Sequence, residues 1–246
     1  MTKAEIQFVR SLADKRVRDA ERLFVAEGDK LIGEILQSGL RVRNIYALEG
    51  HFVGQAESVT AKEMERISQL KTASTSLAVV EQPRHKTPSK AATDKLSLAL
   101  DGVQNPGNLG TIIRLADWFG VEDIFCSEDT ADCFNPKVVQ ATMGAILRVR
   151  VHYLPLAEFL RRTAESGVAV YGTMLDGDNI YDAELGAEGV IVMGNEGKGV
   201  SDECAATFTH KLLIPTYPAE RQGSESLNVA MATGIVCAEF RRRIRG

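Results

Sequence analysis

Three segments of this chain combine glycine with amide, carboxylate and hydroxyl side chains, the first and third also with guanidinium groups, and each contains or follows a short apolar run. They cover residues 101–121, 189–203 and 212–246. Such side chains can orient a polar substrate by hydrogen bonds and can stabilise negative charge that develops during a reaction. The candidate polar residues in these segments are Asn108, Arg114, Glu196, Ser226 and Asn228.

The first segment is typical of a turn followed by a helix. Pro106 and Gly107 break the apolar run, and apolar residues then recur at helical spacing. We expect Asn108 to cap this helix, because an asparagine oxygen accepts hydrogen bonds from the first amides of a helix. Arg114 falls outside the apolar stripe. Taken alone, the segment is explained by a capped amphipathic helix.

The second segment is a glycine-rich loop after the apolar run GVIVM. Its glycines let the backbone approach a ligand closely and expose amide donors. The loop is not a G-x-x-x-x-G-K-[ST] phosphate loop, because Lys198 is followed by Gly199, and it also lacks G-x-G-x-x-G. A nicotinamide-dependent enzyme is therefore disfavoured. We expect a helix to begin near Ser201.

The third segment predicts a long C-terminal helix after a proline-containing loop. We expect Ser224 or Ser226 to cap it. From Leu227 to Ala238 the helix is apolar nearly all round, so it must be buried within the chain or against a second subunit. Asn228 falls inside this predicted helix, where asparagine is unfavourable, and we expect it to make a functional polar contact.

The surrounding elements predict where these segments lie. From residue 95 onward, short apolar strands alternate with helix-length segments, which predicts an α/β domain with a mostly parallel sheet (95–246). Ligands bind at the carboxyl ends of such strands, where all three segments begin. Residues 1–82 predict a small α/β domain. Residues 83–94 have two prolines and no periodicity, and predict a linker.

Composition narrows the class of protein. The chain of 246 residues is 44% hydrophobic, and it has neither an apolar run long enough for a membrane helix nor a signal-peptide core at its start. The scattered cysteines predict buried, reduced thiols in a cytoplasmic protein. They are Cys126, Cys133, Cys204 and Cys237.

The histidines do not suggest a metal site. They share no ligand spacing with one another or with a carboxylate pair, and we expect surface or linker positions for them. They are His51, His85, His152 and His210. The sequence implies no metal.

The charge pattern neither favours nor argues against nucleic-acid binding. A net charge of −4 is unusual for a protein that binds phosphates, although basic residues cluster near both ends. We expect phosphate contacts from these clusters, with solvated helix ends as the alternative. The residues are Lys15, Arg16, Arg18, Arg241 and Arg243.

In order and content, the three segments resemble the motifs of the SpoU (TrmH-type) family of RNA 2′-O-ribose methyltransferases. The matching patterns are N-x-G-N-x-x-x-x-x-R, M-G-x-E-G-x-G, and I-P followed by S-L-N-V-A. The resemblance covers residues 96 to about 243. More loosely, residues 1–82 look like the family's substrate-binding domain, which is similar to kink-turn-binding ribosomal proteins.

The resemblance implies a trefoil-knotted catalytic domain that acts as a homodimer. Composition and periodicity do not indicate a knot, and general topology rules argue against one. In a homodimer, the apolar helix predicted for residues 227–238 would pack against the second subunit.

The resemblance also implies the reaction and its residues. S-adenosylmethionine would donate a methyl group to a ribose 2′-hydroxyl. The five polar candidates above match the motif positions, and the resemblance implies that they are the catalytic residues. We expect Arg114 to bind a phosphate and stabilise the alkoxide, because a guanidinium is a poor base. Glu196 would orient Arg114 or Asn108. The residues expected to hold the cofactor are Thr173, Gly194, Asn195, Glu196, Gly197, Ile214, Pro215 and Leu227.

Some alternatives stay open. Loop 216–225 is longer than is usual in the family, which weakens the expectation of cofactor contacts there. A dimeric RNA-binding or ribosome-assembly factor without catalysis, or a knotted enzyme that methylates a base, would share the fold. Ribosomal RNA is favoured over transfer RNA because of the additional N-terminal domain.

Overall fold

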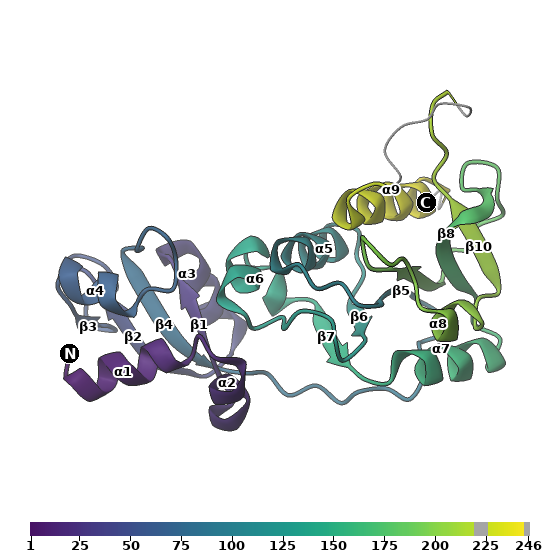
Figure 1. Cartoon of the computed structure of the whole chain (residues 1–246). Coiled ribbons are helices and arrows are strands. Elements are labelled where there is room, and N and C mark those ends of the chain that lie inside the picture. Colours follow the sequence, from purple (N-terminus) through teal and green to yellow (C-terminus); the bar gives the residue numbers. More distant parts are fainter. Residues whose placement is uncertain (219–225, 244–246) are drawn as a thin grey trace. The chain divides into compact units, whose positions relative to one another are not determined.

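The computed structural model describes residues 1–218 and 226–243 (Figure 1). The chain forms two compact units. The first joins Met1–Arg84 to Asp132–Leu147, and the second joins His85–Ala131 to Arg148–Gly246. Residues 132–147 therefore pack with the N-terminal unit, although they follow residues 85–131 of the second unit in the sequence.

The N-terminal unit is a four-stranded sheet between two layers of helices, in strand order β1-β4-β2-β3. Strand β4 is antiparallel to β1 and β2, whereas β3 is parallel to β2. The strands are β1 (Leu23–Glu27), β2 (Val42–Ala47), β3 (Glu57–Ser58) and β4 (Ser76–Glu81), and the first four helices are α1 (Lys3–Ser11), α2 (Lys15–Glu21), α3 (Asp29–Ser38) and α4 (Ala61–Ile67).

Alternate residues of β1 and β4 face two different hydrophobic cores, as the two-residue period of a strand requires. Val25 and Val79 pack in the core that contains residues of α1 and α4. Ala26 and Ala78 pack in the core that contains residues of α3 and Val139. Val139 belongs to α6 (Pro136–Ala141), so the segment 132–147 covers part of this sheet. A short 3-10 helix, η1 (Ala145–Leu147), follows α6.

A buried ion pair ties this segment to the N-terminal helices. The Arg18 side chain is 1% exposed and donates to Asp132 Oδ2 at 2.5 and 3.1 Å, and to the carbonyl oxygens of Leu12 and Ala13. A buried guanidinium requires such partners. The prediction that Arg18 contacts phosphate is therefore wrong.

The second unit has a six-stranded sheet in the order β10-β8-β9-β5-β6-β7, and every pair of neighbouring strands in it is parallel. The predicted α/β architecture with a mostly parallel sheet is confirmed. The strands are β5 (Leu96–Leu100), β6 (Asp123–Cys126), β7 (Arg150–Tyr153), β8 (Val170–Asn179), β9 (Gly189–Met193) and β10 (His210–Leu213).

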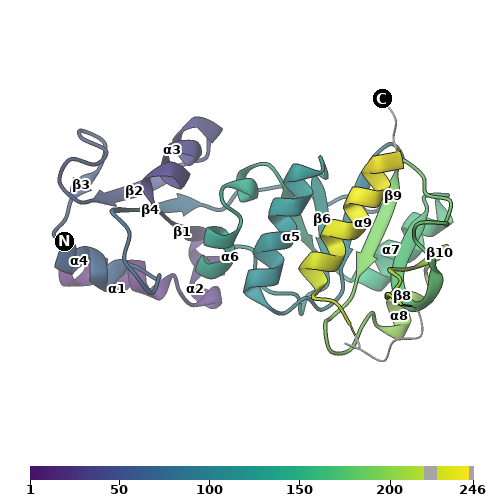
Figure 2. The same ribbon diagram turned by 90° about the horizontal axis from the view of Figure 1, so that it is seen from above.

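Helices cover both faces of this sheet. Helices α5 (Pro106–Trp118) and α9 (Val229–Arg243) lie side by side on one face, whereas α7 (Leu156–Glu165) and α8 (Asp202–Ala205) lie on the other (Figures 1 and 2). Phe159 and Leu160 of α7 pack with Val190 and Val192 of β9. This packing holds the central strands, whose carboxyl ends carry the candidate residues.

The predicted linker has no regular structure but is anchored to the second unit. Ala91 is buried, and its amide donates to Thr163 Oγ1 at 3.1 Å. His85 lies edge-on against His152. His152 is itself buried, stacks on Phe125 and is hydrogen-bonded through Nε2 to Asp123 Oδ1 at 2.9 Å. The expected surface or linker position is wrong for His152, because this carboxylate partner allows the ring to be buried.

Two expectations from composition can be compared with the structure. All four cysteines are buried thiols, as predicted. Among the helices of residues 1–218 and 226–243, none has the length and apolar character that crossing a membrane requires.

Candidate active site

The candidate residues gather at one edge of the parallel sheet. Strands β10, β8, β9 and β5 are neighbours and run in the same direction, so their carboxyl ends meet at this edge. The loop after β5 leads into α5, the glycine-rich loop follows β9, and the chain after β10 leads towards α9. The three segments identified in the sequence therefore meet in space.

Helix α5 begins earlier than predicted. Asn105 is its N-cap and accepts through Oδ1 from the amides of Gly107 (2.8 Å) and Asn108 (3.3 Å). Pro106 occupies the first helical position, where a proline costs no hydrogen bond and its fixed φ suits the helix. The prediction that Asn108 caps the helix is wrong. Its side chain is thereby left available for other contacts.

Helix α9 begins later than predicted. Asn228 lies directly before it and accepts through Oδ1 from the amides of Ala230 (3.1 Å) and Met231 (3.2 Å), as an N-cap does. Asn228 is therefore outside the helix, contrary to prediction. Ser226 does not cap it: its exposed side chain makes no hydrogen bond within the described residues. Ser224 and residues 219–225 of the long loop lie outside the described residues.

Asn108, Glu196 and Asn228 form one hydrogen-bonded group, which we call the amide–carboxylate cluster. Glu196 Oε1 accepts from Asn108 Nδ2 and, at 2.9 Å, from Asn228 Nδ2. Asn228 Nδ2 also donates to Asn108 Oδ1 at 3.0 Å. The side chains of Glu196 and Asn228 are exposed, and that of Asn108 is partly exposed. The cluster thus joins one candidate from each segment in a place that a ligand can reach.

The loop that carries Glu196 is closed on itself. Asn195 and Gly199 exchange two backbone hydrogen bonds of 2.8 Å. A Cβ atom on Gly194 would lie 2.4 Å from the carbonyl carbon of Gly199, so only glycine fits there. The glycine thus serves the turn itself, whatever ligand the loop binds.

The side chain of Asn195 is used inside the protein. Its Oδ1 accepts from the amides of Gly197 (2.9 Å) and Lys198 (3.1 Å), and its Nδ2 donates to the carbonyl oxygen of Gly102 at 2.7 Å. Asn195 therefore shapes the loop and connects it to the loop after β5.

Asp101 makes a second connection between the same loops, one that the sequence did not reveal. Its Oδ2 accepts from the amide (2.7 Å) and the hydroxyl (2.6 Å) of Ser201, which is the N-cap of α8 as expected. The signal was present, since Asp101 is the first residue after β5, at the carboxyl end where sites form. Its partner lies 100 residues away, however, and no local pattern identifies it.

The residues expected to hold the cofactor lie in the segments that meet at this edge. Thr173, in β8, donates to the carbonyl oxygen of Val192 at 2.9 Å. Gly194 and Gly197 lie in the loop after β9. Ile214 and Pro215 follow β10 and are half-buried, and Leu227, shortly before α9, is 51% exposed.

Arg114 is not part of the amide–carboxylate cluster. It lies six residues after Asn108 on α5, which places it roughly 9 Å further along the axis and about 120° around it. Its side chain is exposed, and it makes no hydrogen bond or ion pair with the residues that the structure describes. It can therefore bind an external anion.

Other groups near the site have restricted chemistry. Burial raises the pKa of the Cys204 thiol in α8 to about 11, so it stays protonated at neutral pH and is a poor nucleophile. In residues 1–218 and 226–243, no group of three histidine, cysteine or acidic side chains could hold a metal ion.

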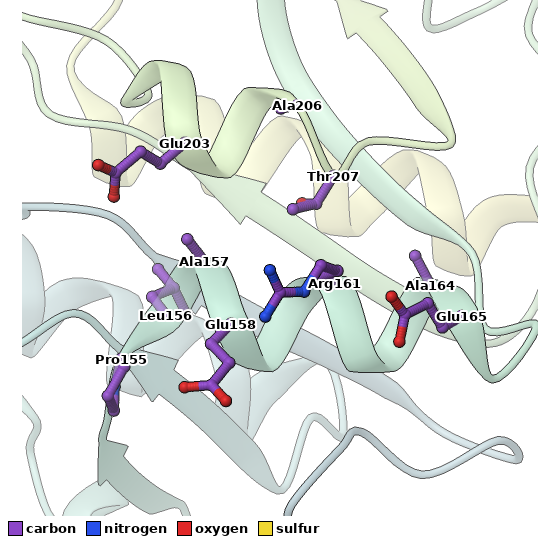
Figure 3. Close-up of a pocket in the computed structure, with 10 residues that line it drawn as sticks. All are labelled: Pro155, Leu156, Ala157, Glu158, Arg161, Ala164, Glu165, Glu203, Ala206 and Thr207. Carbon is purple, nitrogen blue, oxygen red and sulfur yellow. The ribbon is translucent and has the colours of Figure 1, made fainter.

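A surface groove of about 680 Å³ lies between α7 and α8 (Figure 3). No candidate residue lines it. Three glutamates line it with a single arginine, Arg161, so its charge does not favour phosphate. The chemistry described above lies at the sheet edge and not in this groove.

Comparison with known families assigns most of the chain to two family models. Residues 95–238 match the SpoU rRNA Methylase family, and this match spans more than half of the chain. The chain belongs to the SpoU rRNA methylase family. Residues 3–85 match the MRM3-like substrate binding domain. Both matches agree with the resemblance seen in the sequence.

Individual SpoU relatives extend over nearly the whole chain. The 23S rRNA (guanosine(2553)-2′-O)-methyltransferase RlmP of Bacillus subtilis is 30% identical over 240 residues, which is 94% of each chain. A solved structure assigned to the TrmH family of RNA methyltransferases, from Porphyromonas gingivalis, is 38% identical with a TM-score of 0.87 and covers 99% of both chains. An AdoMet-bound rRNA methyltransferase from Sinorhizobium meliloti is 29% identical with a TM-score of 0.86, over 100% of this chain and 97% of that one.

Proposed function

We propose that this protein transfers a methyl group from S-adenosylmethionine to a ribose 2′-hydroxyl of ribosomal RNA. The observation that carries the proposal is the amide–carboxylate cluster, since it unites the asparagine, glutamate and asparagine of the three SpoU motifs. The relatives support ribosomal RNA as the substrate, because the full-length match in Bacillus subtilis is a 23S rRNA 2′-O-methyltransferase.

The residues at the sheet edge fit S-adenosylmethionine. Ile214, Pro215 and Leu227 offer apolar surface for an adenine ring, and the loop of Gly194 and Gly197 offers backbone donors. The Sinorhizobium relative binds AdoMet. When bound, this cofactor supplies an electrophilic methyl group on a sulfonium ion.

The protein's own residues position the RNA. Arg114 binds the phosphate beside the target ribose and stabilises the negative charge that develops on the 2′-oxygen. A guanidinium has a pKa above about 12 and does not serve as the base. Glu196 orients Asn108 and Asn228, its hydrogen-bond partners, rather than Arg114. Ser226 offers an exposed hydroxyl two residues before Asn228.

Ribosomal RNA is the proposed substrate, with transfer RNA as the second candidate. The MRM3-like substrate binding domain over residues 3–85 and the full-length rRNA methyltransferase relatives support this order. In bacteria such a reaction takes place in the cytoplasm, which we propose for this protein.

We also propose that the second unit is trefoil-knotted and forms a homodimer through α5 and α9. The similarity to TrmH-family structures supports the knot. Support for the dimer comes from Trp118 of α5 and Met231 of α9, which are 83% and 64% exposed on adjacent helices. Exposed large apolar side chains of this kind mark interaction surfaces.

The first experiment is isothermal titration of the purified protein with S-adenosylmethionine and S-adenosylhomocysteine. It is followed by incubation with 23S rRNA and radiolabelled cofactor. A ribose methyl blocks alkaline cleavage after the modified nucleotide, whereas a base methyl does not. Cofactor binding with an alkali-resistant labelled dinucleotide is expected. A labelled base would indicate a base methyltransferase, and the absence of both binding and transfer would favour a non-catalytic RNA-binding protein.

Arg114→Lys tests the role of the arginine. We expect the dissociation constant for S-adenosylmethionine to stay within about threefold, while turnover falls about 10²-fold or more, as for other groups that stabilise developing charge. Titration and single-turnover methylation measure the two quantities. Equal losses of affinity and rate would contradict the assignment.

A further inference from the structure

Exposed arginines gather at one end of the N-terminal sheet, where β4 ends. Strands β1 and β2 begin on either side of this end. The backbone shows the arrangement directly: the amide of Gln82 donates to the carbonyl oxygen of Arg22 at 2.8 Å, and the amide of Glu81 donates to that of Arg41 at 2.9 Å. Two strand spacings put Arg22 and Arg41 roughly 10 Å apart.

Arg22 occupies a backbone conformation that suits glycine. It ends α2 with φ 57° and ψ 38°, in the left-handed region. Glycine is the usual residue there because a Cβ atom is disfavoured. Its side chain is exposed and makes no ion pair or hydrogen bond with any residue in the described ranges. An arginine whose backbone is strained, and whose side chain has no polar partner among the described residues, points to a role for its charge outside the chain.

The neighbouring arginines are only loosely paired. The closest carboxylate oxygens lie 3.6 Å from Arg41, on Glu81, and 3.8 Å from Arg43, on Glu21. Exposed pairs at such distances contribute little, so these guanidinium groups can exchange partners. The Arg43 guanidinium also lies over the ring of Phe8, 5.1 Å from its centroid, which holds it in place.

Arg84 extends the same surface. It follows the end of β4 by three residues, is exposed, and has no ion pair or hydrogen bond within residues 1–218 and 226–243. Four arginines and two nearby glutamates, Glu81 and Glu21, give this surface a positive excess. The net charge of the whole chain, by contrast, is −4. Because the protein as a whole is acidic, it does not attract nucleic acid over its entire surface. A local positive excess therefore favours binding of a polyanion at this surface in particular.

We propose that Arg22, Arg41, Arg43 and Arg84 form a phosphate-binding surface through which the N-terminal unit holds the RNA backbone. We call it the arginine edge. The inference deepens the proposed function, on which it rests, by locating the RNA contact on a defined part of the substrate-binding domain. Arg18, one of the five basic residues expected to contact phosphate, is buried and is not part of this surface.

Arg22→Gly gives the sharpest test, because its two expected effects have opposite signs. Relief of the left-handed strain should raise Tm by about 2–4 °C. Loss of one phosphate contact should weaken binding of deproteinised 23S rRNA three- to tenfold and reduce the salt slope by about 0.7 to 0.9. Filter binding from 50 to 200 mM KCl measures affinity and slope on the full-length protein. Arg22→Lys should keep most of the affinity.

A combined variant and a matched control complete the experiment. Arg22→Gly with Arg41→Gln and Arg43→Gln should lose RNA affinity at least 30-fold. Arg66→Gln removes an exposed arginine of α4 that lies two residues before Ser68. Ser68 donates to Glu27 at the opposite end of β1, so this variant should bind as the wild type does. Unchanged binding by the combined variant, or an equal loss in Arg66→Gln, would overturn the arginine edge. Titration with S-adenosylmethionine tests the proposed function separately, because no residue of the arginine edge is in the second unit.

Discussion

At the scale of single residues, Asn228 serves two structures with the two ends of its amide. The oxygen accepts from the first amides of α9, and the nitrogen donates to Glu196 and Asn108. These partners fix which way the amide points. A residue chosen only to cap a helix could be serine, threonine or aspartate. The donor requirement at the other end leaves asparagine.

Asn228→Asp separates these two roles. Aspartate keeps the cap, so Tm should change by no more than about 3 °C, but it places a second carboxylate beside Glu196. Repulsion between the two should open the cluster and lower the methyl-transfer rate about 10²-fold. Single-turnover assays and thermal unfolding measure the two effects. Asn228→Ser, which caps without charge, should lose less activity, and a wild-type rate for Asn228→Asp would contradict the role of the cluster.

At the scale of elements, the loop between β9 and α8 is held in shape by side chains that are hydrogen-bonded within the protein. Asn195 closes it from within, and Asp101 fastens its end at Ser201. Glu196 follows Asn195 directly. The position of the carboxylate therefore depends on an amide that is itself bonded to the loop after β5.

We expect Asn195 to be a positioning residue that acts through Glu196. Asn195→Ala should lower the transfer rate about tenfold in the wild type and have little effect in the Glu196→Gln background, because the group that it positions is already lost. The double-mutant cycle is measured by single-turnover rates at saturating cofactor. Additive losses in the cycle would show that Asn195 acts independently of Glu196. Asp101→Asn, which keeps an acceptor for Ser201, is the milder control.

The helices and strands also show which features could be predicted from the sequence and which could not. Periodicity predicted the strands of the parallel sheet and the apolar stripe of α5, because burial dictates it directly. The N-caps of α5 and α9 were both predicted at the wrong residue. For α5, Asn105 and Asn108 are equally plausible acceptors until Pro106 is recognised as the first helical residue. Arg18 was misjudged for another reason: its partner, Asp132, lies 114 positions away. Pairings at such distances depend on the tertiary structure.

At the scale of the whole molecule, the exposed apolar side chains of α5 and α9 predict the assembly. Replacing Trp118 and Met231 together by serine should convert a dimer into a monomer, because large apolar anchors carry most of the binding energy of an interface. Size-exclusion chromatography with light scattering measures the mass. Leu175→Ser removes another side chain that is 78% exposed and should leave the dimer intact. A monomeric wild type would contradict the proposed dimer.

The discontinuous N-terminal unit has a consequence for how the chain is made. The ribosome releases residues 1–84 first, but the sheet they form is completed by α6 and by Asp132, the partner of the buried Arg18. Until residue 147 has emerged, one sheet face lacks part of its cover and a buried cation lacks its counter-charge. By that time β5, α5 and β6 have also been synthesised. The substrate-binding unit therefore reaches its final form only after folding of the catalytic unit can begin, so the two units form in overlapping stages of synthesis.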